Sequence, residues 1–167
     1  MSLSMYQASI PVFIRALNVL ATLLNKAVTH AEENGLDPDS LLSARLVDDM
    51  YQLSAQIQRA SDAAKFGAAR LAAISPPSFA DEETSFAQLQ ERIANTIAFL
   101  EQVKPEQIDG SEEREIVMKL RDRETHFTGQ SYLLTFALPN FLFHVTTAYD
   151  ILRHKGVKIG KMDYLGF

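Results

Sequence analysis

The chain has 167 residues, 47% of them hydrophobic, so residues 1–167 can form a single domain with its own buried core, and global disorder is excluded. The formal net charge is −5 and no block of lysine and arginine occurs, so neither nucleic acid nor an anionic membrane is expected as a partner. Cysteine is absent, which excludes disulfides, thiolate zinc sites and cysteine nucleophiles and suits a cytoplasmic protein.

The first predicted helix runs from about Ser4 or Ser9 to Glu33. Pro11 either kinks this helix or lies in its first turn, with Ser9 as the N-cap. Its apolar residues recur in steps of three and four, the spacing of a stripe that faces the inside of a helical bundle: Tyr6, Ile10, Phe13, Leu17, Leu20, Leu24, Ala27 and Ala31.

Arg15 and Asn18 interrupt the apolar run at the start of this helix, so it predicts neither a signal peptide nor a membrane span of about 20 apolar residues. His30 lies well off the stripe and is expected in solvent. Asn34-Gly35 is typical of a left-handed C-cap and ends the helix.

The second predicted helix begins at the turn Asp37-Pro38-Asp39-Ser40 and runs to about Ala73. Asp49 lies about 60° from the centre of its apolar stripe, and Gln56 follows two turns later on the same flank. Arg45, four residues before Asp49, is placed for an ion pair with it at the edge of the bundle. The stripe consists of Leu42, Leu46, Met50, Leu53, Ile57, Ala60, Ala64, Ala68 and Leu71.

The alanines and Gly67 in the second half of this helix would let a neighbouring helix approach closely. Ser75-Pro76-Pro77-Ser78 then breaks the helix, and the segment up to Thr84 is long enough to run back along a bundle as a crossover connection. Ser85 and Gln88 have the capping-box spacing and predict the start of a third helix.

The third helix is expected to end near Lys104, with Phe86, Leu89, Ile93, Ile97 and Leu100 facing inward. After a loop, apolar and polar residues alternate, which predicts a short β-hairpin over about Glu115 to Thr128. His126 would be an exposed strand residue of this hairpin. The tail from Val157 to Phe167 has no clear period and is expected to pack as an extended strap.

The last predicted helix, Leu133 to Lys155, carries the largest apolar load in the chain. Pro139 either kinks this helix or starts its regular part. Leu134, Leu138, Phe141, Val145, Ala148 and Leu152 form its stripe.

Asn140 and His144 are four residues apart and therefore project from one face of that helix, one turn apart. His144 lies about 60° from the centre of the stripe, where a polar side chain needs a partner or a ligand. Asp49 on the second helix completes a candidate site, with Gln56 and Tyr149 nearby in angular terms. Two interpretations stay open: a divalent metal bound by imidazole, carboxylate and water, or a polar network in which Asp49 accepts a hydrogen bond from His144.

Other chemistries lack their sequence signals. The chain has no glycine-rich phosphate loop, no G-x-S-x-G nucleophile motif and no Glu-x-x-His pair, so a nucleotide site, a serine hydrolase site and a di-iron carboxylate site are not predicted.

Three segments resemble one uncharacterised bacterial family, a domain of unknown function within the DinB/YfiT-like metalloenzyme superfamily. They are MSLSMYQASIPVFIRALNVLATLLNKA, DDMYQLSAQIQRA and LPNFLFHVTTAYDILRHKGVKIGKMDYLGF. The resemblance implies an all-α, DinB/YfiT-like four-helix bundle with up-down-down-up topology. With the short β-hairpin placed before the last helix, this is the expected fold.

Members of that superfamily typically bind nickel or zinc through three histidines, one on helix two and two a turn apart on helix four, and many are dimers. By position these ligands correspond to Asp49, or a residue near it, and to Asn140 and His144, of which only one is histidine here. The resemblance therefore implies either an enzyme with an altered Asp/Asn/His metal site or a non-catalytic bundle. The latter would bind a small molecule or a partner protein in the vacated space. A homodimer through bundle faces is also expected, since apolar residues such as Leu142 lie off the main stripes.

Overall fold

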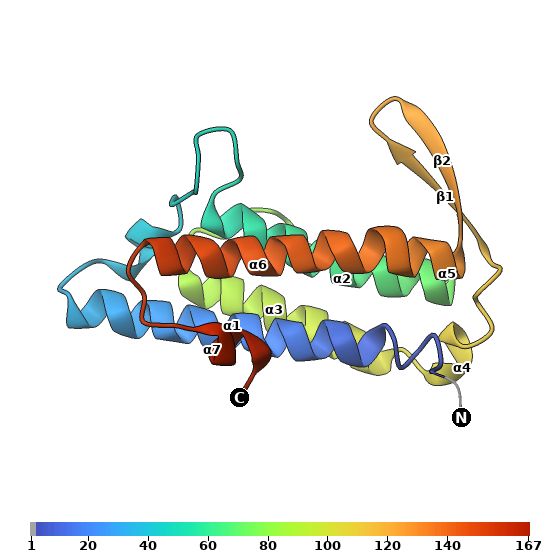
Figure 1. Cartoon of the computed structure of the whole chain (residues 1–167), viewed down its shortest axis with the longest axis horizontal. Coiled ribbons are helices and arrows are strands. Elements are labelled where there is room, and N and C mark those ends of the chain that lie inside the picture. The colour runs from blue at the N-terminus through green and yellow to red at the C-terminus, as the bar shows by residue number, and fades with distance from the viewer. Residues whose placement is uncertain (1–2) are drawn as a thin grey trace.

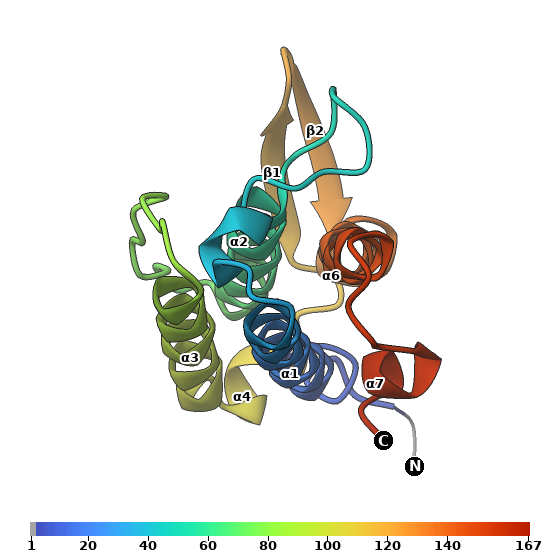
Figure 2. The ribbon, with the colours of Figure 1, turned by 90° about the vertical axis from the view of Figure 1, so that its left-hand side faces the viewer.

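The computed structural model describes residues 3–167, apart from the side chain of Leu120. Four long helices run along one axis (Figure 1). Helix α2 packs against both α3 and α6, and α1 closes the bundle on the other side of α3 and α6 (Figure 2). The predicted four-helix bundle with up-down-down-up topology is confirmed, with α1 at Ile10–Glu33, α2 at Leu53–Ala72, α3 at Phe86–Gln102 and α6 at Leu138–His154.

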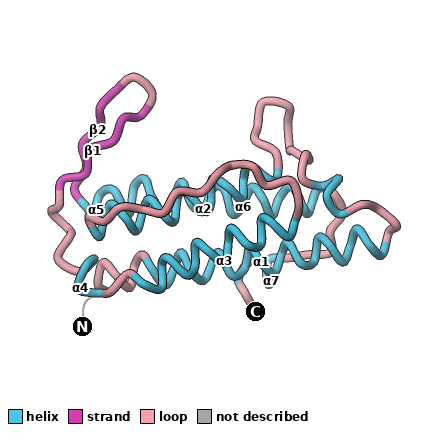
Figure 3. The backbone as a smooth tube through the Cα atoms, turned by 180° about the vertical axis from the view of Figure 1, so that it is seen from behind, coloured by secondary structure: helices cyan, strands magenta, loops and turns pink. Residues whose placement is uncertain are grey.

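The segment between α2 and α3 runs back along the bundle, so these two consecutive helices are parallel (Figure 3). Ala73 ends α2 in the left-handed conformation, with φ of 53°, and the prolines that follow cannot continue a helix. At the far end, Ser85 caps α3 by accepting a hydrogen bond from the backbone N–H of Gln88 at 3.2 Å. The crossover connection predicted from the sequence is thus present.

The predicted start of the second helix is wrong. The chain forms a short 3₁₀ helix, η1 (Pro38–Leu41), followed by a loop, and α2 begins only at Leu53. The backbone N–H of Leu53 donates to the carbonyl of Ala44 at 2.8 Å, so the loop closes on the helix start instead of extending it. Asp39 of η1 accepts from the backbone N–H of Phe86 at 3.0 Å, which ties this segment to α3.

The predicted hairpin is confirmed as β1 (Glu115–Leu120) paired antiparallel with β2 (Arg123–Thr128), and it projects from the bundle (Figure 1). It follows α4 (Pro105–Ile108), a single helical turn. After β2, a Cβ atom on Gly129 would lie 1.9 Å from the carbonyl oxygen of Ser111, so the chain can pass this point only with glycine.

Three helical segments then form one continuous rod: α5 (Gly129–Tyr132), a π-helix, η2 (Leu133–Ala137), and α6. A π-helical turn contains more residues than an α-helical turn, so it shifts the positions before it by about one residue, or 100°. For this reason Leu133 is buried while Leu134, predicted to lie on the inward stripe, is 52% exposed. Pro139, the second residue of α6, lies directly after the π-helix and supplies no N–H to this continuous rod.

The core lies where α1, α2 and α6 meet. Phe13 of α1 packs edge-to-face on Phe141 of α6, with ring centroids 5.1 Å apart. Gly67 of α2 leaves room for this contact, because a Cβ there would lie 3.1 Å from the Phe13 ring. The close approach predicted at Gly67 is therefore present.

The tail is not only an extended strap. After the buried residues Val157 and Ile159 it forms α7 (Lys161–Leu165), which packs on α1. Tyr164 of this short helix contacts Tyr149 of α6 edge-to-face, with centroids 5.8 Å apart.

Helix α1 is, within residues 3–167, the one helix long and apolar enough to cross a membrane. Its apolar residues are those of the bundle core, as in the core helix of a soluble domain, so its composition is weak evidence for a span.

Candidate functional site

His144 and Gln56 form a hydrogen bond between α6 and α2. Nδ1 of His144 lies 2.7 Å from Oε1 of Gln56, and His144 is only 8% exposed. The amide nitrogen of Gln56 donates to the carbonyl of Tyr51 at 3.2 Å, which fixes Oε1 as the acceptor facing the ring. Nδ1 of His144 therefore carries the proton, and Nε2 keeps its lone pair.

The same ring is electrically neutral near pH 7. Burial, the larger cause, and the positive charge of Arg59 together lower the pKa of His144 from 6.5 to about 4. A neutral imidazole with Nδ1–H engaged can accept a hydrogen bond, take a proton or bind a metal through Nε2.

His144 lines a pocket of about 260 Å³ between α2 and α6, which we call the α2–α6 pocket. The π-helix and the hairpin form one end of it, and π-helical turns in other proteins frequently occur at functional sites. Its lining residues are Arg59, Asp62, Ala63, Phe66, Arg70, Met118, Tyr132, Phe136, Ala137, Asn140 and His144.

Two arginines and one carboxylate give this pocket its charge. Asp62 is already bound by Arg92 at 2.9 Å and by Lys65 at 3.0 Å. Arg59 pairs with Asp81 at 3.0 Å. Arg70 forms no ion pair with any residue of the described chain, 3–167, and so its positive charge is not compensated locally.

A group of aromatic rings at the base of the hairpin forms the apolar part of the pocket lining. Tyr132 and Phe136 are stacked with centroids 5.8 Å apart, and Phe127 contacts both. Arg70 lies over the rings of Phe66 and Tyr132, 5.3 and 5.8 Å from their centroids, and donates to the hydroxyl of Tyr132 at 3.0 Å. The aromatic rings and the guanidinium of Arg70 therefore lie together in this part of the pocket.

The structure brings two of the three predicted site residues together. Asn140 and His144 both line the α2–α6 pocket. Asp49 lies in the loop before α2 and is exposed, so the prediction that it lies on the second helix beside His144 is wrong. Its predicted ion pair is also absent from the described residues, because Arg45 donates to the carbonyl of Asp48 and the side chain of Gln52. Gln56 takes the place that the sequence analysis gave to Asp49.

The donor set does not fit the metal that the resemblance implies. His144 is the one imidazole in the lining, and the one lining carboxylate, Asp62, is held by cations. Arg70, which has no ion pair among residues 3–167, adds positive charge, and this opposes a divalent cation. Within residues 3–167, no group of three or more His, Asp or Glu residues is placed to hold a metal ion.

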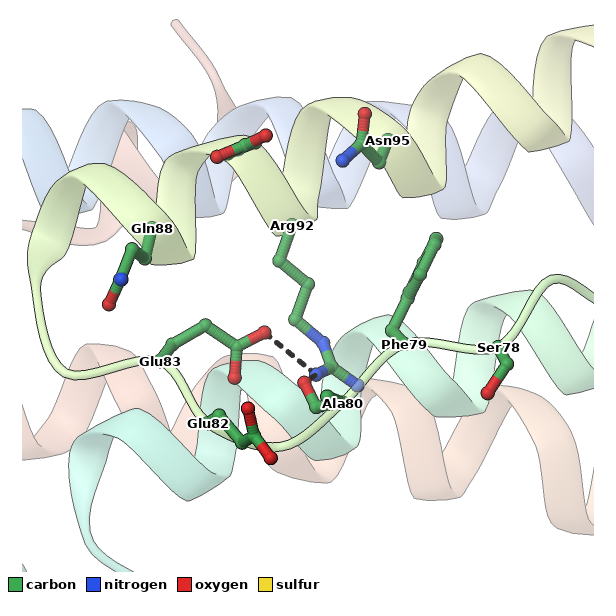
Figure 4. A pocket seen from close by; sticks show the side chains of 9 residues that line it. Ser78, Phe79, Ala80, Glu82, Glu83, Gln88, Arg92 and Asn95 are labelled. Carbon is green, nitrogen blue, oxygen red and sulfur yellow. Dashed lines mark hydrogen bonds and ion pairs between the residues drawn. The ribbon is translucent and has the colours of Figure 1, made fainter.

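A second polar cluster, which the sequence analysis missed, surrounds Arg92 of α3 (Figure 4). Its buried guanidinium pairs with Asp62, Asp81 and Glu83 at 2.8 to 2.9 Å. Lys65, also buried, binds Asp62 and lies 4.4 Å from the centre of the Phe79 ring. Burial raises the pKa of Glu83, but the hydrogen bonds from Arg92, Gln58 and the backbone, together with the charge of Arg92, outweigh this effect, so the pKa is lowered.

This cluster holds the crossover segment onto α2 and α3, and we assign it a structural role. Its charges satisfy one another, although it borders a pocket of about 330 Å³. A sequence signal existed: Arg92 lies three residues after Leu89 and four before Thr96, within the buried stripe of α3. A charged residue at such a position requires buried partners of opposite charge.

Comparison with known proteins places the chain in a family. The profile of a family described as a domain of unknown function, DUF1993, matches residues 5–165, and the chain belongs to this family. Among solved structures, the chain is similar to a DinB family member protein from Shewanella denitrificans, with 38% sequence identity and a TM-score of 0.92. The match covers 97% of this chain and 92% of that one. No functionally curated protein matches the chain.

Proposed function

We propose that this member of the DUF1993 family binds a small organic molecule in the α2–α6 pocket, with Nε2 of His144 as a hydrogen-bond acceptor. The observation that carries the proposal is the bond from Nδ1 of His144 to Gln56, because it leaves the other ring nitrogen of a buried, neutral imidazole available. Asn140, one turn earlier on α6, adds a donor and an acceptor to the same lining.

The size and composition of the pocket support this proposal. Its volume of about 260 Å³ lies just below the range of about 300 to 1,000 Å³ that is typical of ligand pockets. Apolar and aromatic walls with a few convergent polar groups are the usual composition of such sites. The lining holds one base but no activated nucleophile and no carboxylate free of ion pairs, so binding is better supported than catalysis.

Fragment screening by NMR tests the proposal. A library of acidic, basic and neutral fragments is added to the ¹⁵N-labelled full chain, and the perturbed signals are assigned. We expect at least one fragment to shift signals of His144 and Asn140, and Ala63→Phe, which fills the pocket, to abolish the shifts. Ala94→Phe, on the exposed face of α3, is the matched control and should leave them unchanged. Fragments that perturb only other regions would contradict the proposal.

We also propose that the protein is a cytoplasmic homodimer, with neither nucleic acid nor membrane as a partner. The solvent face of η2 and α6 supports the dimer, because Leu134, Leu142 and Phe143 are exposed there. The net charge of −5 argues against polyanionic partners. Light scattering at micromolar concentration should give twice the monomer mass, and Phe143→Lys should reduce it. A monomer at that concentration would contradict the dimer.

A further inference from the structure

We infer that the ligand of the α2–α6 pocket is a small organic anion, a carboxylate attached to an aromatic or other flat apolar body, and that Arg70 binds the carboxylate. This inference rests on the proposed function, since it assigns a chemical class to the molecule bound at that site. Three observations from different parts of the pocket lead to it.

The first observation is the position of Arg70. Its guanidinium is half-buried beside two aromatic rings, and one of its nitrogens, Nη1, donates to the hydroxyl of Tyr132. These contacts hold the side chain in place without neutralising it, because no carboxylate of residues 3–167 pairs with it. A guanidinium fixed in this way is well suited to bind a carboxylate through its remaining N–H groups.

The second observation concerns Arg59, which lies about three helical turns before Arg70 on α2 and also lines the pocket. Its Nε is buried and has no hydrogen-bond acceptor among the described residues, although its two terminal nitrogens bind Asp62 and Asp81. A buried donor without an acceptor costs about 1–3 kcal/mol, so such donors are few in folded proteins. The unsatisfied N–H leaves positive potential beside the pocket, which favours an anion there.

The third observation is the balance of charge. Asp62 is the only carboxylate in the lining, and Lys65 and Arg92 both bind it from the side of the Arg92 cluster. Arg59 is itself paired with Asp62 and Asp81, so Arg70 is the lining cation that no carboxylate of residues 3–167 neutralises. Burial and the charge of Arg59 disfavour the protonated form of His144, which therefore does not repel a cation or attract an anion. An anionic ligand is stabilised in this field, whereas an amine or a metal cation is not.

The aromatic rings define the rest of the ligand. Phe66, Tyr132 and Phe136 line the pocket around Arg70, and flat rings pack favourably against such surfaces. His144 of α6, whose Nε2 keeps its lone pair, lines the same pocket. A ligand hydroxyl that donates to this nitrogen would add affinity, so a hydroxyl group on the aromatic body is the substituent that His144 would recognise.

Benzoate and benzamide separate the charge from the shape, because they have nearly the same size and differ by one negative charge. Each is titrated into the ¹⁵N-labelled full chain while the signals of His144 and Asn140 are followed. We expect benzoate to bind about tenfold more tightly than benzamide or better, as a charged hydrogen-bond acceptor should. Arg70→Gln should remove this preference, and Arg153→Gln, an exposed arginine at the end of α6, should preserve it.

Hydroxybenzoates then test the contact with His144. At least one of the three positional isomers should bind more tightly than benzoate, and His144→Asn should remove that gain while keeping the preference for benzoate over benzamide. Equal binding of benzamide and benzoate would overturn the anionic class and leave a ligand pocket in place. No response to benzoate, when other fragments perturb His144, would also overturn the anionic class. Failure of every fragment to reach the pocket would instead refute the proposed function.

Discussion

His144 on α6 and Gln56 on α2 are joined by a hydrogen bond of 2.7 Å inside the bundle, between residues 88 positions apart in the chain. The bond connects the two helices that pack together most extensively. It also decides which nitrogen of the imidazole carries the proton, so one contact has both a structural and a chemical consequence.

Replacing Gln56 by leucine should destabilise the protein by about 1–3 kcal/mol, because the ring N–H of His144 would lose its acceptor while remaining buried. The free energy of unfolding, measured by urea denaturation, checks this. Gln102→Leu, at the exposed end of α3, is the control and should change stability little. The double variant Gln56→Leu/His144→Leu should recover part of the loss, since both polar partners are then removed. A Gln56→Leu protein as stable as the wild type would contradict the buried hydrogen bond.

Acid should destabilise the fold through His144. Above pH 6.5 the ring is neutral in both the folded and the unfolded chain. As the pH falls, the unfolded chain takes up the proton near pH 6.5, but the folded chain does so only near pH 4. At 1.36 kcal/mol per pH unit, the unfolding free energy should fall by about 3 kcal/mol across this window.

The variant His144→Asn isolates this contribution, because an asparagine amide can still donate to Gln56 but does not titrate. Urea denaturation at a series of pH values should show a flatter dependence between pH 6.5 and 4 in the variant than in the wild type. Parallel curves for the two proteins would mean that the imidazole is already protonated, or solvated, in the folded state.

Loss of Arg92 should be more damaging than loss of any exposed arginine. Arg92→Met strands carboxylates of Asp62 and Glu83 in a partly buried cluster, and breaking such a buried ion network costs roughly 3–5 kcal/mol. The midpoint of denaturation should fall accordingly, while Arg153→Met should have little effect. Limited proteolysis should then cleave within residues 75–84, because the cluster holds this segment onto the bundle. An unchanged midpoint would show that the cluster contributes nothing to stability.

Metal should have no defined place in the α2–α6 pocket. Protein purified without a histidine tag should contain far less than one equivalent of nickel or zinc per chain, and a chelator should leave the melting temperature unchanged. The reason is the donor set, in which a single imidazole is accompanied by two arginines. Stoichiometric metal that is lost in His144→Asn would reverse this conclusion.

The sequence predicted the fold well because most of the core is built from periodic apolar residues. The stripe from Ile10 to Ala31 is buried along its whole length, and the alternation after Glu115 correctly indicated a hairpin. The prediction from the sequence failed where hydrogen bonds between distant residues override a local apolar pattern. Leu42 and Leu46 have helical spacing. However, the carbonyls of Leu42 and Ala44, which follow η1, accept from the first N–H groups of α2, so the helix starts later.

The candidate site was predicted in part for the same reason. Asn140 and His144 share one helix, so their spacing alone places them together. Assigning the partner of His144 required knowing where α2 begins, and the later start transfers that role from Asp49 to Gln56. The π-helix before α6 and the charges of Arg59 and Arg70 depend on tertiary contacts that no spacing rule describes.

The tautomer of His144 tests the central claim most directly. A long-range ¹H–¹⁵N NMR spectrum of the imidazole at pH 7 distinguishes a protonated nitrogen from one that carries a lone pair. We predict a neutral ring with the proton on Nδ1 and an Nε2 signal that moves when a pocket-binding fragment is added. A doubly protonated ring, or a neutral ring with the proton on Nε2, would contradict the proposed ligand site.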